Sequence, residues 1–131
     1  MIGLDTNVLV RFIAQDDEKQ SPIATALIEK LNAETPGYVT LVSLVELVWV
    51  MQSCYDCKKS EIVDILNKLL RTQELIIENA ETAFKALILF SKSKADFADC
   101  LIERSANSAG CMHTVTFDEK SAKTAGMRHL V

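Results

Sequence analysis

Two acidic residues in this chain of 131 residues stand where an apolar, strand-like segment ends. Asp5 closes the run "MIGLD" at the start, and Asp118 follows "CMHTVTF" near the end. A helix is expected directly after each, so either acid could be a polar residue at a strand exit or a helix N-cap. Since one cap per helix suffices and Thr6 or Asn7 could supply it, we interpret Asp5 as a functional residue.

Glu46 lies in an apolar helical stretch, "VSLVELVWV". Its spacing from Ser43 is that of a capping box, in which the glutamate reaches back to the backbone of the N-cap residue. The helix is apolar almost all round, however, and a carboxylate among apolar neighbours needs a partner or an ion. The residues alone leave both interpretations open.

A further pair of acids, Asp96 and Asp99, occurs in "KADFADCLIERSA". Their i, i+3 spacing places both on one face of a helix. An N-cap followed by a first-turn acid would have the same spacing, because the positive end of the helix dipole favours both. Two carboxylates on one helix face can equally be metal ligands.

The chemistry of a site built from these residues follows from their oxygen atoms. Hard divalent ions such as Mg²⁺ or Mn²⁺ take carboxylate ligands, whereas Zn²⁺ prefers His and Cys. The two histidines show no ligand spacing. The pair in "CYDC" follows a helical stretch, although a reactive thiolate is stabilised at a helix N-terminus. We therefore expect ordinary reduced thiols and an all-oxygen metal site.

Strand-like and helical segments alternate along the chain, which predicts an α/β fold with a mostly parallel sheet of four to five strands covered on both faces. Ligands of such sheets gather at the carboxyl ends of the strands, where Asp5 and Asp118 are expected. One domain, 1–131, accommodates all segments. The expected strands are 1–5, 37–42, 74–78, 111–117 and 128–131, and the expected helices are 7–14, 21–34, 43–54, 58–71, 80–91, 96–109 and 119–125.

Charge and hydropathy restrict the class of protein. The formal net charge of −4 does not suit a bulk nucleic-acid binder, although a metal ion can reverse the sign of the field locally. No apolar run approaches the roughly 18 residues of a membrane span. The start of the chain lacks the pattern of a signal peptide. We expect a cytoplasmic protein that does not insert into a membrane.

Taken in order, these motifs resemble one family. Asp-Thr-Asn after the first strand, Ser-x-x-Glu in the helix after the second, "FADCLIERSA" and "VTFD" are similar to the PIN domain. The size and the start of the chain resemble the VapC-type toxins of bacterial toxin–antitoxin pairs. The resemblance implies a three-layer α/β/α sandwich and a metal-dependent endoribonuclease.

The resemblance also implies roles for individual positions. Asp5, Glu46 and Asp99 match the conserved acids, Asp118 matches a fourth, more variable acid, and Asp96 is an additional acid. The implied supporting positions are Thr6, Asn7, Ser43 and Thr116. The implied cofactor is Mg²⁺ or Mn²⁺, which would activate the water that hydrolyses an RNA phosphodiester bond.

The partners implied by the resemblance are an RNA substrate, a second copy in a homodimer, and an antitoxin whose tail enters the active site. The apolar stretch "SLVELVWVM" fits an interface unless the sheet covers it.

Two alternatives remain. A phosphoacceptor or aspartyl phosphatase-like domain also places an aspartate at a strand end; the phosphatase expects a second aspartate where Asn7 stands, whereas a receiver's lysine could be Lys120. A non-catalytic PIN-like binding module would have no use for clustered carboxylates, which repel one another.

Overall fold

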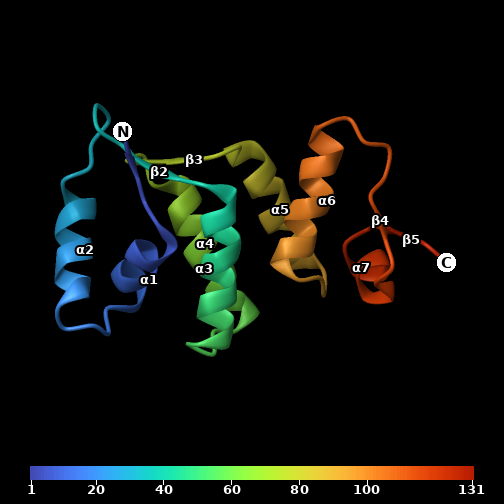
Figure 1. Ribbon diagram of the computed structural model, residues 1–131, viewed down its shortest axis with the longest axis horizontal. Coiled ribbons are helices and arrows are strands. Elements are labelled where there is room, and N and C mark those ends of the chain that lie inside the picture. The colour runs from blue at the N-terminus through green and yellow to red at the C-terminus, as the bar shows by residue number, and fades with distance from the viewer. The chain divides into compact units, whose positions relative to one another are not determined.

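The computed structural model describes residues 1–131, which form two compact units, Met1–Glu78 and Asn79–Val131. Figure 1 shows the order of the elements. Unit 1 contains β1 (Ile2–Gly3), α1 (Thr6–Ala14), α2 (Gln20–Glu29), β2 (Gly37–Val39), α3 (Leu41–Ser53), α4 (Lys59–Arg71) and β3 (Leu75–Ile77). Unit 2 contains α5 (Ala80–Lys92), α6 (Phe97–Ser108), β4 (Val115–Thr116), α7 (Glu119–Thr124) and β5 (Arg128–His129).

The strands of unit 1 form a parallel sheet in the order β1-β2-β3. Helices connect each strand to the next, as parallel pairing requires. This arrangement confirms the predicted α/β class with a parallel sheet. Because β1 runs directly into α1, the junction at Asp5 lies at the carboxyl end of its strand.

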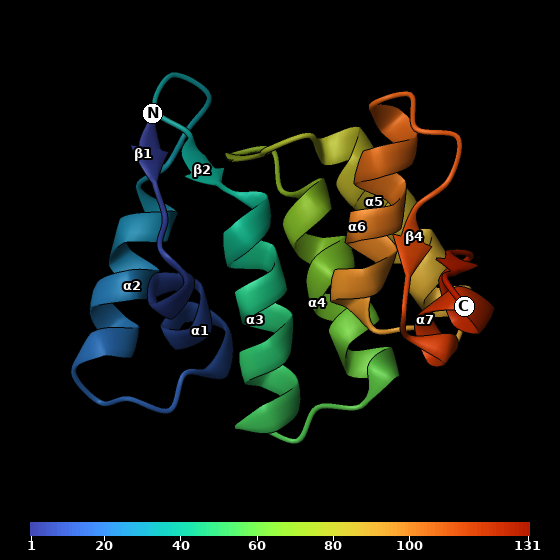
Figure 2. The ribbon, with the colours of Figure 1, turned by 45° about the vertical axis from the view of Figure 1, so that its right-hand side comes forward.

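Each helix of unit 1 buries one face. In α3 the buried side chains are Leu44, Leu47, Val48 and Met51, which recur at the i, i+3, i+4, i+7 spacing of one helix face. Figure 2 shows α3 and α4 side by side, joined by the loop at their lower ends. Burying each large aliphatic side chain contributes about 1.5–3 kcal/mol, so this face fixes the position of α3.

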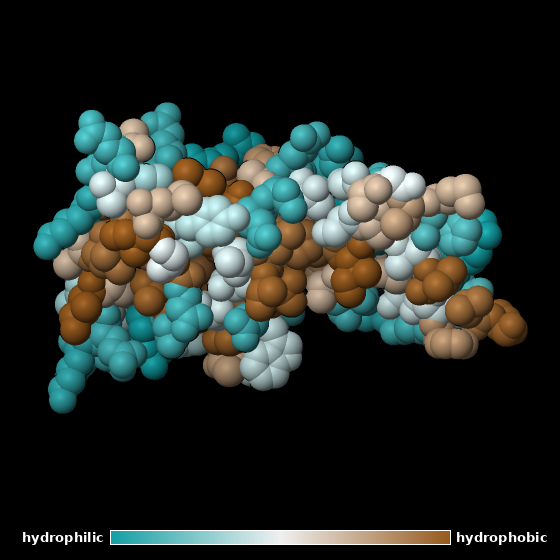
Figure 3. Space-filling view, turned by 45° about the horizontal axis from the view of Figure 1, so that its top comes forward, coloured by the Kyte–Doolittle hydropathy of each residue, from teal (hydrophilic) through white to brown (hydrophobic).

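Apolar side chains also reach the surface of unit 1. Ile23 of α2 and Val42 of α3 are each 69% exposed, and Trp49 of α3 is 64% exposed. Figure 3 shows apolar patches of this kind between hydrophilic side chains. The sheet therefore does not cover all of "SLVELVWVM".

In unit 2, α5 and α6 pack against each other. The rings of Phe90 and Phe97 meet edge to face, with centroids 5.8 Å apart and planes at 83°. Such a pair adds about 0.5–1.5 kcal/mol to the burial of the rings. The contact lies at the connection between the helices, so it fixes the N-terminus of α6, where Asp96 and Asp99 stand.

The last two strands correct one expectation. All five expected strands are present, but they form sheets of three and two strands instead of one sheet of four to five. The backbone explains the division, because the partner of β4 is β5: Arg128 N–H donates to Thr114 O at 2.8 Å, and Leu130 N–H donates to Thr116 O at 2.7 Å.

The helix expected over 21–34 is shorter and begins earlier than predicted. Asp17 Oδ1 accepts hydrogen bonds from the N–H groups of Lys19 and Gln20, at 3.0 and 2.7 Å, and so starts α2 at Gln20. Asn32 Oδ1 accepts from the N–H groups of two following residues and holds a turn after the helix. The helices of the protein are all too short or too polar to traverse a lipid bilayer.

Candidate active site

Asp5 is the N-cap of α1, which corrects the expectation that Thr6 or Asn7 takes this role. The backbone of Asp5 is extended (φ −75°, ψ 159°), and its Oδ1 accepts a hydrogen bond from Thr6 N–H at 2.8 Å. Oδ2 makes no hydrogen bond within the protein. Capping and function are therefore compatible, because the cap occupies one carboxylate oxygen and leaves the other free for a cation.

The capping box that the spacing of Ser43 and Glu46 left open is absent. The N-cap of α3 is Thr40, whose Oγ1 accepts from Ser43 N–H at 3.1 Å. Ser43 is therefore inside the first turn, and Glu46 lies too far along the helix to reach the N-cap. Glu46 instead accepts a hydrogen bond at 2.8 Å from the hydroxyl of Thr6, 40 residues earlier in the chain.

The exposure of Glu46 corrects the expectation that its carboxylate lies among apolar neighbours. Its side chain is exposed, because α3 turns it away from the buried face that carries Leu44 and Leu47. Glu46 therefore does not need an ion to compensate for burial. What marks it is its position beside Thr6 and Asp5, at the start of α1.

Asp5 and Glu46, here called the unit-1 carboxylate pair, line one pocket of about 430 Å³. The cation of this pocket is Arg11, whose Nε donates to Gln20 Oε1 at 2.8 Å and whose Nη1 lies 3.7 Å from Asp16. Arg11 is therefore held away from a direct ion pair with the carboxylate pair. The other lining residues are Thr6, Asn7, Val10, Val50, Cys54 and Tyr55.

In unit 2, Ser121 connects two of the predicted acids. Its hydroxyl donates to Asp99 Oδ2 at 2.9 Å, and its backbone N–H lies 3.4 Å from Asp118 Oδ1. Asp118 is the N-cap of α7 and also accepts from Lys120 N–H at 2.8 Å. Asp99 and Asp118, here called the unit-2 carboxylate pair, thus both contact one buried residue, which is 3% exposed: Asp99 through its hydroxyl and Asp118 through its backbone N–H.

The N–H groups at the start of α7 also set the charge of Asp118. The hydrogen bond from Ser121 N–H, followed by that from Lys120 N–H, lowers the pKa of Asp118 below its ordinary value. Thr116 supports this arrangement, because its Oγ1 accepts from Asp118 N–H at 3.0 Å. Asp118 is therefore a carboxylate at neutral pH and is oriented by the turn between β4 and α7.

Sequence reasoning missed Ser121. The signal was available in "DEKS", where a serine three residues after an N-cap aspartate lies in the first turn of the helix. Its partner could not be read from the sequence, because Asp99 is 22 residues away.

Asp96 differs from the other acids. It is the N-cap residue of α6 but makes no side-chain capping hydrogen bond, and its Oδ1 lies 3.7 Å from Lys120 Nζ. Both side chains of this ion pair are well exposed, so the pair contributes little, about 0–1 kcal/mol. Asp96 is therefore three residues from Asp99 in sequence, but its carboxylate faces a lysine instead of an uncharged hydroxyl.

The remaining thiols and imidazoles form no metal site. None of the four cysteines forms a disulfide. Burial raises the pKa of Cys57, so this thiol is less ionised than an exposed one. His129 Nε2 lies 3.1 Å from Phe117 O, a structural contact between β5 and the end of β4.

Carboxylate oxygen is the only ligand type that the predicted residues offer. This donor chemistry fits Mg²⁺ or Mn²⁺, which bind oxygen and retain several waters. Within neither unit does a group of three or more His, Cys, Asp or Glu side chains gather to hold a metal ion. Each unit therefore supplies one carboxylate pair, and a neutral hydroxyl, from Thr6 or Ser121, orients one member of each.

Comparison with known proteins gives two findings. The family model of the PIN domain matches residues 2–127. A VapC ribonuclease of Aquifex aeolicus (strain VF5) is 26% identical over 120 residues, which cover 92% of this chain and 89% of that protein. Both matches extend over unit 1 and unit 2, and the residues that the family model matches include all the carboxylates named above.

Proposed function

Because this chain belongs to the PIN domain family, we propose that it is a ribonuclease in which the two carboxylate pairs, Asp5 with Glu46 and Asp99 with Asp118, serve one Mg²⁺ or Mn²⁺ site. The observation that carries the proposal is the pattern of hydrogen bonds. Thr6 orients Glu46 and Ser121 orients Asp99 through uncharged donors. The similarity to a protein named VapC ribonuclease supports the reaction class.

The two hydroxyl groups would position ligands without neutralising them. A lysine or arginine in direct contact would stabilise a carboxylate more strongly, because charge-assisted pairs are the stronger ones, but it would compete with a cation. A hydroxyl fixes the orientation of one oxygen and leaves the charge of the group in place. Thr6 and Ser121 are therefore proposed as positioning residues for the metal ligands.

The proposed reaction uses water as the nucleophile. A bound divalent ion would supply the charge that activates the water and binds the phosphate. Tyr55, which lines the pocket of the unit-1 carboxylate pair, is not proposed as the nucleophile. The hydrogen bond to Asp16 raises the pKa of Tyr55, so that the phenol stays protonated at neutral pH. Asp96 is proposed as an additional metal ligand, whose carboxylate pairs with Lys120 when no metal is bound.

The alternative of a phosphoacceptor domain has less support. A receiver-type site would need a lysine beside its acceptor aspartate, and Lys120, the candidate, directs its ammonium to Asp96. Acyl-phosphate labelling of Asp5 would favour this alternative over hydrolysis.

We propose that the chain is the cytoplasmic toxin of a toxin–antitoxin pair, by analogy with the relative's name. An antitoxin would place an Arg or Lys side chain at the unit-1 carboxylate pair, which lines a pocket with space for it. An inhibitory partner whose basic residues can all be changed to alanine without loss of inhibition would contradict this.

A homodimer is proposed from the exposed apolar face of α3, which presents Val42 and Trp49 to solvent. Light scattering at micromolar concentration tests it. A particle of twice the chain mass is expected, and Trp49→Gln should shift it toward the monomer, whereas a strict monomer for the unmodified protein contradicts the dimer.

The ribonuclease activity itself is tested by cleavage of a fluorescently labelled RNA. We expect cleavage with Mg²⁺ or Mn²⁺, none with chelator, and none in Asp5→Asn, Glu46→Gln or Asp99→Asn. Glu29→Gln is the control, because Glu29 is an exposed acid at the end of α2 and does not line the pocket of the unit-1 carboxylate pair. Cleavage that persists in chelator, or in all three variants, would refute the proposal.

A further inference from the structure

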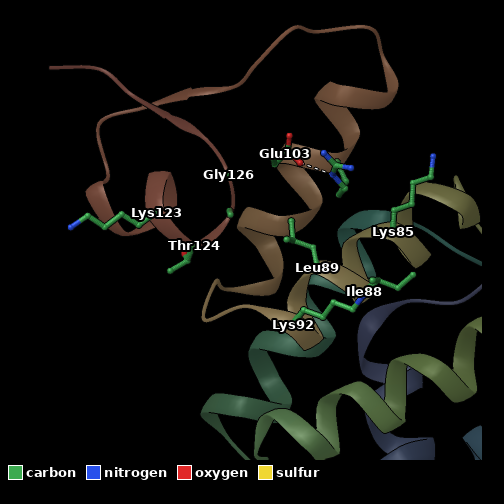
Figure 4. Close-up of a pocket in the computed structure, with 10 residues that line it drawn as sticks. Lys85, Ile88, Leu89, Lys92, Glu103, Lys123, Thr124 and Gly126 are labelled. Carbon is green, nitrogen blue, oxygen red and sulfur yellow. Dashed lines mark hydrogen bonds and ion pairs between the residues drawn. The ribbon is translucent and has the colours of Figure 1, made fainter.

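Unit 2 contains a groove of about 650 Å³ that the carboxylate pairs do not enter. Its walls come from α5, α6 and the end of α7 (Figure 4). Four of its lining residues are cations, Lys85, Lys92, Arg104 and Lys123, and one is an anion, Glu103. The groove is therefore a concentration of positive charge in a chain with a net charge of −4.

The α5 wall has a regular pattern. Lys85, Ile88, Leu89 and Lys92 follow the i, i+3, i+4, i+7 spacing of one helix face. Figure 4 shows Ile88 and Leu89 between the two lysines. Ile88 is 46% exposed, so the wall offers apolar surface between two lysines whose Cα atoms lie about 10 Å apart along the helix axis.

Arg104 on α6 is fixed through its Nε, and its Nη groups are available to a ligand. Its Nε donates to Glu103 Oε1 at 2.5 Å, and this bond raises the pKa of the guanidinium. Glu103 is only 8% exposed and is compensated by this contact. Both Nη groups of Arg104 make no hydrogen bond within the protein, and a guanidinium with free Nη groups can bind phosphate through two donors.

The other cations of the groove are weakly held. Lys85 pairs with Glu81 at 3.4 Å and Lys123 with Glu119 at 3.0 Å, both as exposed i, i+4 pairs. Such pairs contribute a few tenths of a kcal/mol, so a phosphate can replace the glutamate. Figure 4 shows Lys123 extending outward, which places it at the rim. Lys92 makes no ion pair.

We propose that this groove binds the sugar–phosphate backbone of single-stranded RNA. The proposal rests on the ribonuclease function proposed above. Residues 1–78 carry seven Lys and Arg against twelve Asp and Glu, so unit 1 repels a polyanion. Residues 79–131 carry seven against six, and four of the seven line the groove. An RNA substrate needs this attraction, because a metal ion neutralises only the phosphate it contacts.

The test measures, by fluorescence anisotropy, the binding of a fluorescein-labelled 12-nucleotide oligouridylate. Chelator is present, so that metal-dependent hydrolysis cannot occur. The groove variant is Lys85→Gln/Lys92→Gln. Its matched control is Lys68→Gln/Lys94→Gln, which also removes one lysine of an exposed i, i+4 pair and one lysine without an ion pair, outside the groove. Melting curves verify that both variants fold.

The expected loss follows from counterion release. If each lysine contacts one phosphate, the groove variant should reduce the slope of log affinity against log salt by about 1.4 and weaken binding about 25-fold at 0.1 M salt. Arg104→Gln should add a further loss. The control variant should bind as the unmodified protein does.

The proposal that the groove binds RNA would be contradicted by equal RNA binding in the groove and control variants, or by no RNA binding at all. Preferential binding of an oligoglutamate peptide would also contradict it, because the groove would then be a site for acidic proteins. Groove-dependent binding without metal-dependent cleavage would contradict the ribonuclease function alone. Intact cleavage, with equal RNA binding by the groove variant and its control, would contradict RNA binding by the groove alone.

Discussion

Ser121→Ala isolates the contact that orients Asp99. The substitution removes the hydroxyl that donates to Asp99 Oδ2 at 2.9 Å and leaves the backbone N–H near Asp118 in place. A hydrogen bond to a charged group contributes about 1.5–3 kcal/mol, and the lower value applies because Asp99 is half-buried and can recruit water. Alanine returns about 0.5 kcal/mol through its higher helix propensity. The expected net loss is about 1 kcal/mol in the free energy of unfolding.

The assay is thermal unfolding followed by circular dichroism. An unfolding entropy of about 2.1 cal/mol/K per residue gives roughly 275 cal/mol/K for 131 residues, so a loss of 1 kcal/mol lowers the Tm by about 4 °C. Ser91→Ala is the control, because Ser91 is an exposed helical serine that bonds only to Ile88 O. Its Tm should change by less than about 2 °C.

A double-mutant cycle assigns the loss to the contact. In an Asp99→Ala background, Ser121→Ala should no longer destabilise the protein, because the hydroxyl has lost its acceptor. RNA cleavage should also fall in Ser121→Ala, since Asp99 is no longer held. An unchanged Tm in Ser121→Ala, or the same loss with and without the Asp99 carboxylate, would refute the assignment of Ser121 as a positioning residue.

Three further predictions concern single side chains. Thr6→Val keeps the shape of Thr6 but removes the donor to Glu46, so metal-dependent RNA cleavage should fall about tenfold, which corresponds to roughly 1.4 kcal/mol in barrier height. Thr6→Ser keeps the donor and should keep the cleavage rate. Equal initial rates in both variants would count against the role of Thr6. Thr40→Ala should lower the free energy of unfolding in urea by about 1 kcal/mol through loss of the α3 N-cap, and Ser43→Ala should cost less, whereas the capping-box interpretation requires the reverse. The lowered pKa of Asp118 implies stabilisation that is complete above its unfolded pKa and is lost as pH falls through the lower folded value, so Asp118→Asn should flatten the acid limb of a plot of Tm against pH, and an unaltered limb would contradict this.

The fold was largely predictable because its signals are local. Alternating strand-like and helical segments indicated all seven helices and all five strands, and the parallel α/β class followed from the alternation. The division of the strands into sheets of three and two was not predictable, because strand pairing depends on long-range hydrogen bonds such as that from Arg128 N–H to Thr114 O. The start of α2 at Gln20 was not predicted, because it depends on a turn before the helix in which Asp17 Oδ1 accepts from the N–H groups of Lys19 and Gln20.

The carboxylates were predictable as residue types, but their partners were not. The Ser-x-x-Glu spacing suggested a local contact for Glu46, whereas its partner, Thr6, lies on another helix. The sequence offers Thr6 and Asn7 as caps of α1, yet Asp5 is the cap. Ser121 is recognisable in "DEKS" as a first-turn serine, but nothing in the sequence identifies Asp99 as the acceptor of its hydroxyl. Contacts between segments distant in sequence depend on packing, which composition and periodicity do not encode.

The central claim is that the two carboxylate pairs serve one metal site, and calorimetric titration of Mn²⁺ tests it most directly. The proteins are the unmodified chain, Asp5→Asn from unit 1, Asp99→Asn from unit 2, and the double variant. If the acids act together, either single change should weaken Mn²⁺ binding strongly, and the double variant should be little worse than either single one. A shared site would be contradicted if the losses of binding free energy in the two single variants add up to the loss in the double variant within about 0.5 kcal/mol. It would also be contradicted if one single variant binds Mn²⁺ as the unmodified protein does.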